Sequence, residues 1–274
     1  MTEQEYRSHP AVSRSELFRM SESPEKFRYF KDHPVQPTPA LVFGQAFHKM
    51  ALQPEDFYTE FAVIPNVDRR TKDGKAEYQA FLNENGEKTL ITGDDFAKIQ
   101  AMCTALNEAH SVTENGDVYY ARKLLSGQKE VPFFWTDEMT GEECKCRVDC
   151  LSSVKDLNLI VDLKTAAKAD MESFTRDIVK YGYDLQTAMY AEGVKANTGV
   201  ACGFVFIVIE KEEPYSVNIC QADPLIMKRG YDLFREYMGI YHDCRQTGNW
   251  YGYLGKYGMI NNVSLPAWLA KEYE

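Results

Sequence analysis

The feature that most restricts the fold is a pair of strand-like segments in the middle of the chain. Residues 141–153 (GEECKCRVDCLSS) alternate between polar and small apolar side chains, and residues 157–165 (LNLIVDLKT) form an apolar run that ends in charge. Alternation is typical of a strand, because successive side chains point to opposite faces. It predicts that Lys145, Arg147 and Asp149 share one face. The opposite face then carries Cys144, Cys146, Val148 and Cys150.

The segments around this pair predict a mixed sheet. Residues 129–135 read as a strand joined to residues 141–153 by a turn at Thr140-Gly141, and residues 202–210 and 215–222 read as two more strands. Helical patterns occupy residues 13–33 (interrupted at Pro24), 40–52, 76–85, 94–110, 170–196 and 223–245. This order indicates an α/β fold with a mixed central β-sheet flanked by helices and a helical N-terminal part.

The length of 274 residues and the apolar content of 44% suit one large domain with a well-packed core. We expect a single domain over residues 1–274. It divides into a mainly helical part at residues 1–125, a catalytic core at 126–248 and an irregular, aromatic tail at 249–274.

Composition also restricts the location and the partners. No stretch of 18 apolar residues predicts a membrane span, and the polar start MTEQEYRSHP lacks a signal-peptide pattern, so we expect a cytoplasmic protein. The seven cysteines lie mostly in strand-like segments and read as buried, reduced thiols. The net charge of −10 argues against a broadly basic surface for nucleic acid. A DNA-binding protein of this composition must confine its positive charge to a local groove.

Two carboxylates and a lysine at the strand ends carry the chemistry. Asp162 and Lys164 are two residues apart and project together, and pairing of the two strands would bring Asp149 close to Asp162. Carboxylate oxygens suit Mg²⁺, which can bind a scissile phosphate and lower the pKa of a bound water. Lys164 could orient or deprotonate that water, and a second metal is possible. Taken alone, the D-x-K pattern is as well explained by a salt bridge at a strand end.

Four further residues have both a functional and an ordinary interpretation. Gln186 and Tyr190 lie four apart on one helix face and could contact a phosphate or the lysine, or could belong to an ordinary amphipathic helix. His48, one turn after Gly44, could be a metal ligand or a hydrogen-bonded core histidine. Glu130 could serve a second metal or be a surface charge.

The ordered set of four motifs resembles the PD-(D/E)XK nuclease superfamily, and in particular its RecB-like branch. The motifs are Gly44…His48, Arg147-Val-Asp149, Asp162-Leu-Lys164 and Gln186…Tyr190. Longer stretches resemble the RecE-type exonuclease VIII nuclease domain of phages and prophages. These stretches are residues 21–27, 38–48, 68–75 and 140–149.

This resemblance implies a 5′→3′ exonuclease that acts on double-stranded DNA in phage-type recombination. It implies a Mg²⁺ site, at which Mn²⁺ can substitute, with His48, Asp149, Asp162 and the Leu163 carbonyl as ligands. Lys164 would serve the nucleophilic water. It also implies a homo-oligomeric ring around DNA and a single-strand annealing recombinase as partner. A ring with a basic inner channel would reconcile DNA binding with the acidic net charge.

The basic segment at residues 68–75 contains Arg69, Arg70, Lys72 and Lys75. It reads either as a solvated loop or as a phosphate contact where DNA approaches, and we expect Arg147 to contact DNA as well. Some RecB-like relatives carry an iron–sulfur cluster. Here Ser23-Pro24 stands where an early Cys-Pro is expected and a late C-x2-C group is missing, so we predict no cluster.

Two alternatives to an exonuclease follow from the same residues. One is a structure-specific or nicking endonuclease on the same fold. The other is a catalytically silent DNA-binding or interaction module. The silent module is disfavoured because every residue of the motif set is present.

Overall fold

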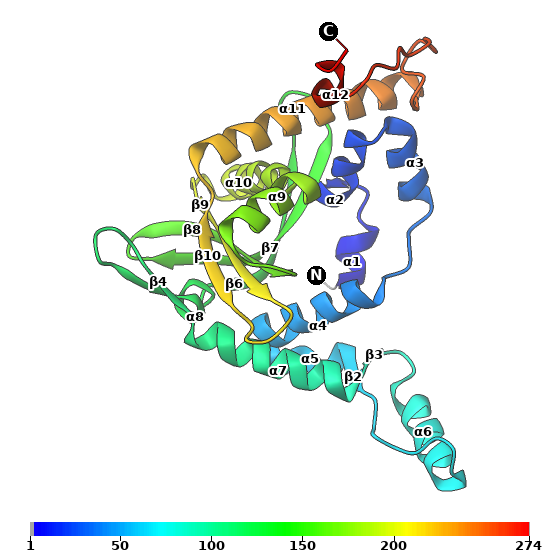
Figure 1. The fold of residues 1–274 in the computed structure, drawn as a ribbon, viewed down its shortest axis with the longest axis vertical. Coiled ribbons are helices and arrows are strands. Elements are labelled where there is room, and N and C mark those ends of the chain that lie inside the picture. Colours follow the sequence, from blue (N-terminus) through cyan, green and yellow to red (C-terminus); the bar gives the residue numbers. More distant parts are fainter. Residues whose placement is uncertain (1–2, 274) are drawn as a thin grey trace.

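A six-stranded mixed sheet lies at the centre of the computed structural model, which describes residues 3–273 (Figure 1). Its order is β1-β7-β8-β9-β10, and β6 pairs with β7. The β1–β7 and β8–β9 pairs are parallel and the other pairs are antiparallel. The strands are β1 (Val12–Ser13), β6 (Gln128–Thr136), β7 (Glu143–Val154), β8 (Leu157–Ala166), β9 (Gly203–Glu210) and β10 (Val217–Gln221). The predicted α/β class with a mixed sheet flanked by helices is confirmed.

Helices cover both faces of this sheet, and a hydrophobic core fills each side. One core lies beneath α4 (Pro39–Leu52), α5 (Phe57–Glu60), α7 (Gly93–Glu108) and α8 (Ala121–Leu124). The other lies beneath α2 (Arg14–Leu17), α3 (Pro24–Asp32), α9 (Met171–Tyr181), α10 (Tyr183–Thr198) and α11 (Pro224–Thr247). The chain also contains the short helical elements α1 (Glu3–Ser8), η1 (Phe18–Ser21), η2 (Pro54–Asp56) and α12 (Ala267–Ala270). No helix among residues 3–273 combines the length and hydropathy needed to cross a membrane.

Local chemistry explains where several of these helices begin and end. Pro24 is the first residue of α3, and the Ser23 hydroxyl accepts a hydrogen bond from Lys26 N at 3.2 Å, which confirms two short helices around this proline. The single helical stretch predicted for residues 170–196 is instead two helices. They meet at Gly182, whose φ of +66° is the left-handed conformation that ends many helices.

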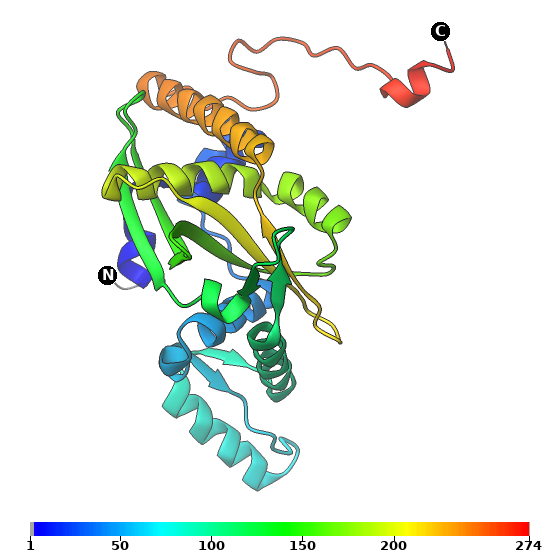
Figure 2. The same ribbon diagram turned by 90° about the vertical axis from the view of Figure 1, so that its left-hand side faces the viewer.

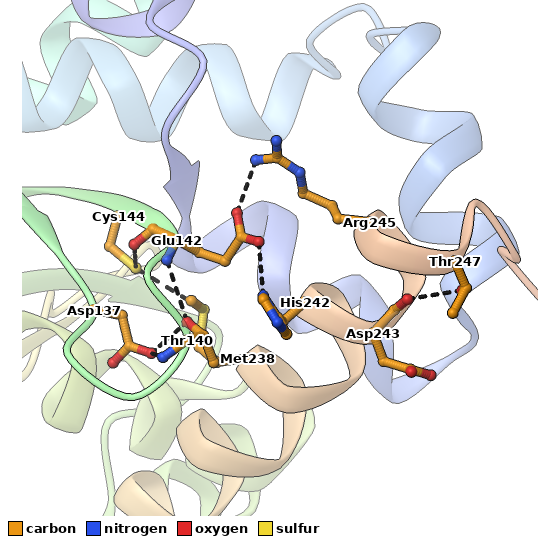
Figure 3. Close-up of polar contacts among 9 residues, drawn as sticks. All are labelled: Asp137, Thr140, Glu142, Cys144, Met238, His242, Asp243, Arg245 and Thr247. Carbon is orange, nitrogen blue, oxygen red and sulfur yellow. Dashed lines mark hydrogen bonds and ion pairs between the residues drawn. The ribbon is translucent and has the colours of Figure 1, made fainter.

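The β6–β7 turn is fastened to α11 by two buried carboxylates. Asp137 lies 2.7 Å from the Arg235 guanidinium. The Glu142 carboxylate lies 3.0 Å from His242 Nδ1 and 2.7 Å from Arg245 Nη1 (Figure 3). Charge-assisted contacts of this kind compensate for burying the carboxylates, and they hold the hairpin against the helix layer.

A helical arm projects from the sheet (Figures 1 and 2). The parallel strands β2 (Phe61–Val63) and β3 (Thr89–Ile91) carry α6 (Lys72–Asn85) at its tip. The Thr71 hydroxyl accepts a hydrogen bond from Gly74 N at 3.0 Å, and the helix begins at Lys72. The basic segment at residues 68–75, which could be a solvated loop, is therefore partly helical.

The remaining secondary structure lies at the periphery. A small antiparallel hairpin pairs β4 (His110–Val112) with β5 (Val118–Tyr120). The chain after α11 is mostly irregular up to α12, as expected for the tail, and it extends away from the sheet in Figure 2. All seven cysteines are free thiols, and five of them are buried: Cys144, Cys146, Cys150, Cys220 and Cys244.

Candidate active site at a fork in the sheet

Strand β7 changes partner along one of its edges, and this leaves a fork in the sheet. Residues 150–154 pair with β8, whereas residues 144 and 145 pair with β1. Because β6 pairs along most of the opposite edge, β1 and β8 must share the remaining one. Between them the Asp149 carboxylate replaces a strand partner, since its Oδ2 accepts a hydrogen bond from Leu163 N at 2.9 Å. The candidate site lies at this fork.

The predicted alternation along β7 is wrong at one position. Cys144, Cys146 and Val148 belong to the core beneath α10 and α11, as expected for one face, but Cys150 belongs to the core beneath α4 and α7. The change falls at Asp149, opposite Glu130 of β6. Glu130 has a φ of +49° and is skipped in the pairing register. A left-handed residue breaks the regular pleat, so the strand turns over at the fork.

Asp162 and Lys164 project together from β8, as predicted. The register Cys150↔Val161 places Asp162 one step beyond the last β7–β8 pair, opposite Asp149. Asp162 is 1% exposed and forms an ion pair with Lys164. Burial raises the pKa of Asp162 and the nearby Asp149 charge adds to the rise, whereas Lys164 and His48 lower that pKa. The charges of Asp149, Lys164 and His48 therefore lie close enough to Asp162 to change its pKa.

His48 reaches the fork from α4, on the other side of the sheet. Its Nδ1 lies 3.5 Å from Asp149 Oδ2. A Cβ on Gly44, one turn earlier, would lie 3.8 Å from Thr165 Oγ1, which places α4 against the end of β8. That distance is an ordinary van der Waals contact. The structure therefore leaves room for a methyl group at Gly44.

Helix α10 supplies Gln186, whose Nε2 donates a hydrogen bond to Asp162 Oδ1. Gln186 is 2% exposed, so this contact is shielded from solvent. Tyr190, one turn later, packs against the core beside Phe204, and burial raises its pKa well above the usual range for tyrosine. The structure thus brings Gln186 to the carboxylate and packs Tyr190, one turn away, beside Phe204.

Arg147 and Glu130 form an ion pair beside the fork. Arg147 Nε lies 2.8 Å from Glu130 Oε2, and the guanidinium lies 5.1 Å from the centre of the Tyr6 ring. Burial, followed by the charges of Asp149 and Asp162, raises the pKa of Glu130 to about 8. The positive charge of Lys49 opposes this rise. Glu130 is therefore a half-buried member of the acidic group at the fork and not a surface charge.

Apart from Arg147, the basic residues predicted to contact DNA lie away from the fork. Arg69, Arg70, Lys72 and Lys75 are all on the projecting arm, which Figures 1 and 2 show away from the sheet. Arg70 Nε lies 3.1 Å from Asp68 Oδ1, and the Arg69 guanidinium lies 4.1 Å from the centre of the Tyr78 ring. The fold thus separates this basic group from the carboxylates.

Sequence reasoning missed two residues of the site. Arg14 donates a hydrogen bond from Nη2 to Gln186 Oε1 at 3.3 Å, although 172 residues separate the two in the chain. Tyr183 places its ring centre 4.6 Å from Lys164 Nζ. A local signal could have revealed Tyr183, because it stands three residues before Gln186 and so lies on the same helix face. Arg14 has no local signal of this kind.

The donors at the fork fit a hard divalent cation. His48 offers an imidazole nitrogen, Asp149 and Asp162 offer carboxylates, and Leu163 offers a backbone carbonyl. Asp162 Oδ2 is fully buried. Apart from its ion pair with Lys164, it accepts no hydrogen bond from any of residues 3–273. Within this described part, no three His, Cys, Asp or Glu side chains converge as a ready metal cage, because Asp162 is turned toward Lys164 and Gln186. These ligand types fit a metal ion that would take the place of Lys164 beside the Asp162 carboxylate.

The forked sheet, the two strand-end carboxylates and the adjacent lysine define a PD-(D/E)XK-type core. Residues 13–262 match a family described as a PDDEXK-like domain of unknown function, DUF3799, and the chain belongs to this family. It is thereby a member of the PD-(D/E)XK superfamily, as the motif set predicted. The RecB-like and RecE-type resemblance stays a prediction.

One of two solved structures that are similar to this chain shares its fold, at low sequence identity. A crystal structure from Eubacterium rectale, named "Putative exonuclease", covers 97% of this chain and 96% of its own, with a TM-score of 0.60 and 14% identity. The structure named SSO0001 covers 86% of this chain and 81% of its own, with a TM-score of 0.40 and 11% identity. No curated protein matches the chain.

Proposed function

We propose that this protein is a Mg²⁺-dependent DNA exonuclease that degrades double-stranded DNA from its ends, with 5′→3′ polarity. The observation that carries this proposal is the meeting of Asp149 and Asp162 at the fork, with the Lys164 ammonium held beside them. Membership of the PDDEXK-like family supports a nuclease, and the name of the Eubacterium rectale protein favours an exonuclease.

The proposed roles follow from the position of each group. His48, Asp149, Asp162 and the Leu163 carbonyl hold the divalent metal, which when bound neutralises phosphate charge and acidifies a water molecule. Lys164, released from Asp162, would hold the attacking water by a hydrogen bond from its ammonium, or would accept the proton of that water after losing its own proton to solvent. Gln186 keeps Asp162 in place by donating to its second oxygen. Tyr190 supports Gln186 from one turn away, and Glu130 is available to a second metal.

The partners belong to the same proposal. Double-stranded DNA is the substrate, with Arg147 and the arm residues Arg69, Arg70, Lys72 and Lys75 contacting phosphates. A homo-oligomeric ring would collect these basic groups around DNA while the net charge stays at −10. A single-strand annealing recombinase would take over the exposed strand in the cytoplasm. Residues 1–274 would act as one domain without an iron–sulfur cluster.

The decisive experiment compares linear duplexes, labelled at either the 5′ or the 3′ end, with closed circular duplexes of the same sequence. Each is incubated with Mg²⁺, with Mn²⁺ or with a chelator. We expect the metal-containing reactions to release the 5′ label first and to spare the circle. Asp162→Asn, which keeps the shape of the side chain but removes its charge, should abolish cleavage with little change in the thermal midpoint.

Each alternative predicts a different result. A structure-specific or nicking endonuclease would convert the closed circle to a nicked or linear form. A silent DNA-binding module would leave every substrate intact with either metal. Cleavage by Asp162→Asn at the wild-type rate would show that the fork is not the active site.

A further inference from the structure

The N-terminal segment reaches the fork through one arginine. Val12 of β1 is fully buried and pairs with Cys144 of β7, and Arg14 follows at the start of α2. Its Nη1 donates a hydrogen bond to the Tyr181 carbonyl at 3.0 Å, and its Nη2 donates to Gln186 Oε1 at 3.3 Å. One guanidinium thus links the end of α9 to the first turns of α10.

Tight packing holds Arg14 in this position. A Cβ placed on Gly182, at the α9–α10 junction, would lie 2.4 Å from the ring of Phe18, which immediately follows α2. The Arg14 guanidinium also lies 5.9 Å from the centre of the Tyr183 ring, the ring that Lys164 approaches at 4.6 Å. The segment after β1 is therefore seated on the junction that leads into Gln186.

The contact with Arg14 determines which end of the Gln186 amide faces Asp162. An amide has one accepting and one donating end, a guanidinium can only donate, and a carboxylate can only accept. With Arg14 bound to Oε1, the Nε2 end must face Asp162, as it does in the structure. Without Arg14, the amide could rotate and turn its oxygen toward the carboxylate.

We propose that Arg14 is a positioning residue that fixes the amide of Gln186 and thereby holds Asp162 for catalysis. The N-terminal segment thus becomes part of the active centre. This inference rests on the proposed nuclease function, because it assigns Arg14 to the same site.

The kinetic test is a double-mutant cycle with Arg14→Met, Gln186→Met and the double variant on an end-labelled linear duplex. We expect Arg14→Met to lower kcat about 10- to 100-fold, as for other residues that orient a ligand of a metal site. The KM for DNA should change less than about 2-fold, because no binding contact is lost. The double variant should be no slower than Gln186→Met alone, since Arg14 acts through Gln186.

Two further variants separate the effect of the Arg14–Gln186 hydrogen bond from the effect of the positive charge. Arg14→Lys keeps the charge but has a single ammonium in place of the two-pronged guanidinium, so it should recover only part of kcat. Arg19→Met removes a positive charge from the same segment, at a residue that pairs with Glu22 at 3.0 Å, and should cut like the wild type. Losses that multiply in the double variant, or that appear mainly in KM, would show that Arg14 binds DNA directly and would overturn the proposal.

A readout without cleavage separates this proposal from the proposed function. The side-chain amide NMR signals of Gln186, assigned by their loss in Gln186→Met, should move in Arg14→Met and stay in place in Arg19→Met. Signals that do not move in Arg14→Met would reject the positioning role. A wild-type protein that cuts no DNA would instead reject the nuclease function, whatever these signals show.

Discussion

At the scale of single residues, the fork depends on side chains that take over backbone roles. The Asp149 carboxylate accepts the hydrogen bond of Leu163 N, which a strand carbonyl would accept in a continuous ladder. Leu163 keeps its own side chain in the core beneath α4 and α7. One aspartate thus joins the two strands and still presents carboxylate oxygens near His48. The facing Asp162 is buried, and a buried carboxylate is costly to ionise unless a cation is close.

At Glu130, the cost of ionising a buried carboxylate can be measured as a change in the free energy of unfolding with pH. Its pKa rises in the folded protein to about 8, so between the unfolded pKa near 4.5 and that value the folded state binds more protons than the unfolded state. The free energy of unfolding should therefore fall as the pH rises from 5 to 8.5 without divalent metal. In Glu130→Gln the fall should be smaller by at least about 1 kcal/mol.

Urea unfolding at several pH values measures this difference. Glu172→Gln, which alters an exposed carboxylate on α9, is the matched control and should follow the wild type. Wild-type and Glu130→Gln curves of the same slope would show that Glu130 is already ionised in the folded protein at pH 5.

At the scale of elements, the position of Gln186 depends on how closely α11 approaches α10. A Cβ on Gly230 of α11 would lie 1.9 Å from the Asp184 carbonyl oxygen, two residues before Gln186. The Asp184 side chain is buried and paired with Arg229 of α11. Backbone contact between the helices is therefore possible only at a residue without a side chain. The β6–β7 turn, held by Asp137 and Glu142, fastens β6 and β7 to α11 as well.

Gly230→Ala should destabilise the protein by about 1–3 kcal/mol, as is typical when a methyl group is forced into a close-packed contact. It should also lower cleavage, because α10 must move and carries Gln186. Gly239→Ala on the same helix is the matched control: its Cβ would meet no atom within 4 Å, and alanine favours helices over glycine by up to about 1 kcal/mol. Thermal or urea unfolding compares the two variants. Equal stability would show that α10 and α11 adapt without strain.

At the scale of the whole molecule, the basic residues of the arm are separated from the carboxylates at the fork. The net charge is −10, and the predicted phosphate-binding residues lie on the arm formed by β2, β3 and α6 (Figure 1). DNA that reaches both the fork and the arm would span a large part of the molecule. A ring of several copies, as proposed, would supply such a path.

Replacing Arg69 and Lys72 together by alanine should weaken binding to duplex DNA. The slope of log affinity against log salt should become shallower by about 1.8, because each lost phosphate contact accounts for about 0.9. Binding is measured in an Asp162→Asn background, which prevents cleavage. As control, Arg176→Ala with Lys228→Ala removes two basic residues that form ion pairs within α9 and α11. An unchanged salt slope in the arm variant would exclude the arm from the DNA path.

The amino-acid sequence by itself determined most of the longer elements and many of the residues that share one face of a strand or helix. The strands at β6 to β10, the helix carrying His48 and the common face of Asp162 and Lys164 all follow from periodicity, which depends only on neighbours in the chain. The spacing of Gln186 and Tyr190 follows in the same way.

Only the tertiary structure decided how these pieces meet. The reversal of β7 at Asp149 depends on Glu130 in another strand, and the bond between Arg14 and Gln186 joins residues 172 positions apart. The outward position of the basic arm depends on the pairing of β2 with β3. Such contacts leave no periodic trace in the chain, because they arise from packing and pairing between segments that are distant in sequence.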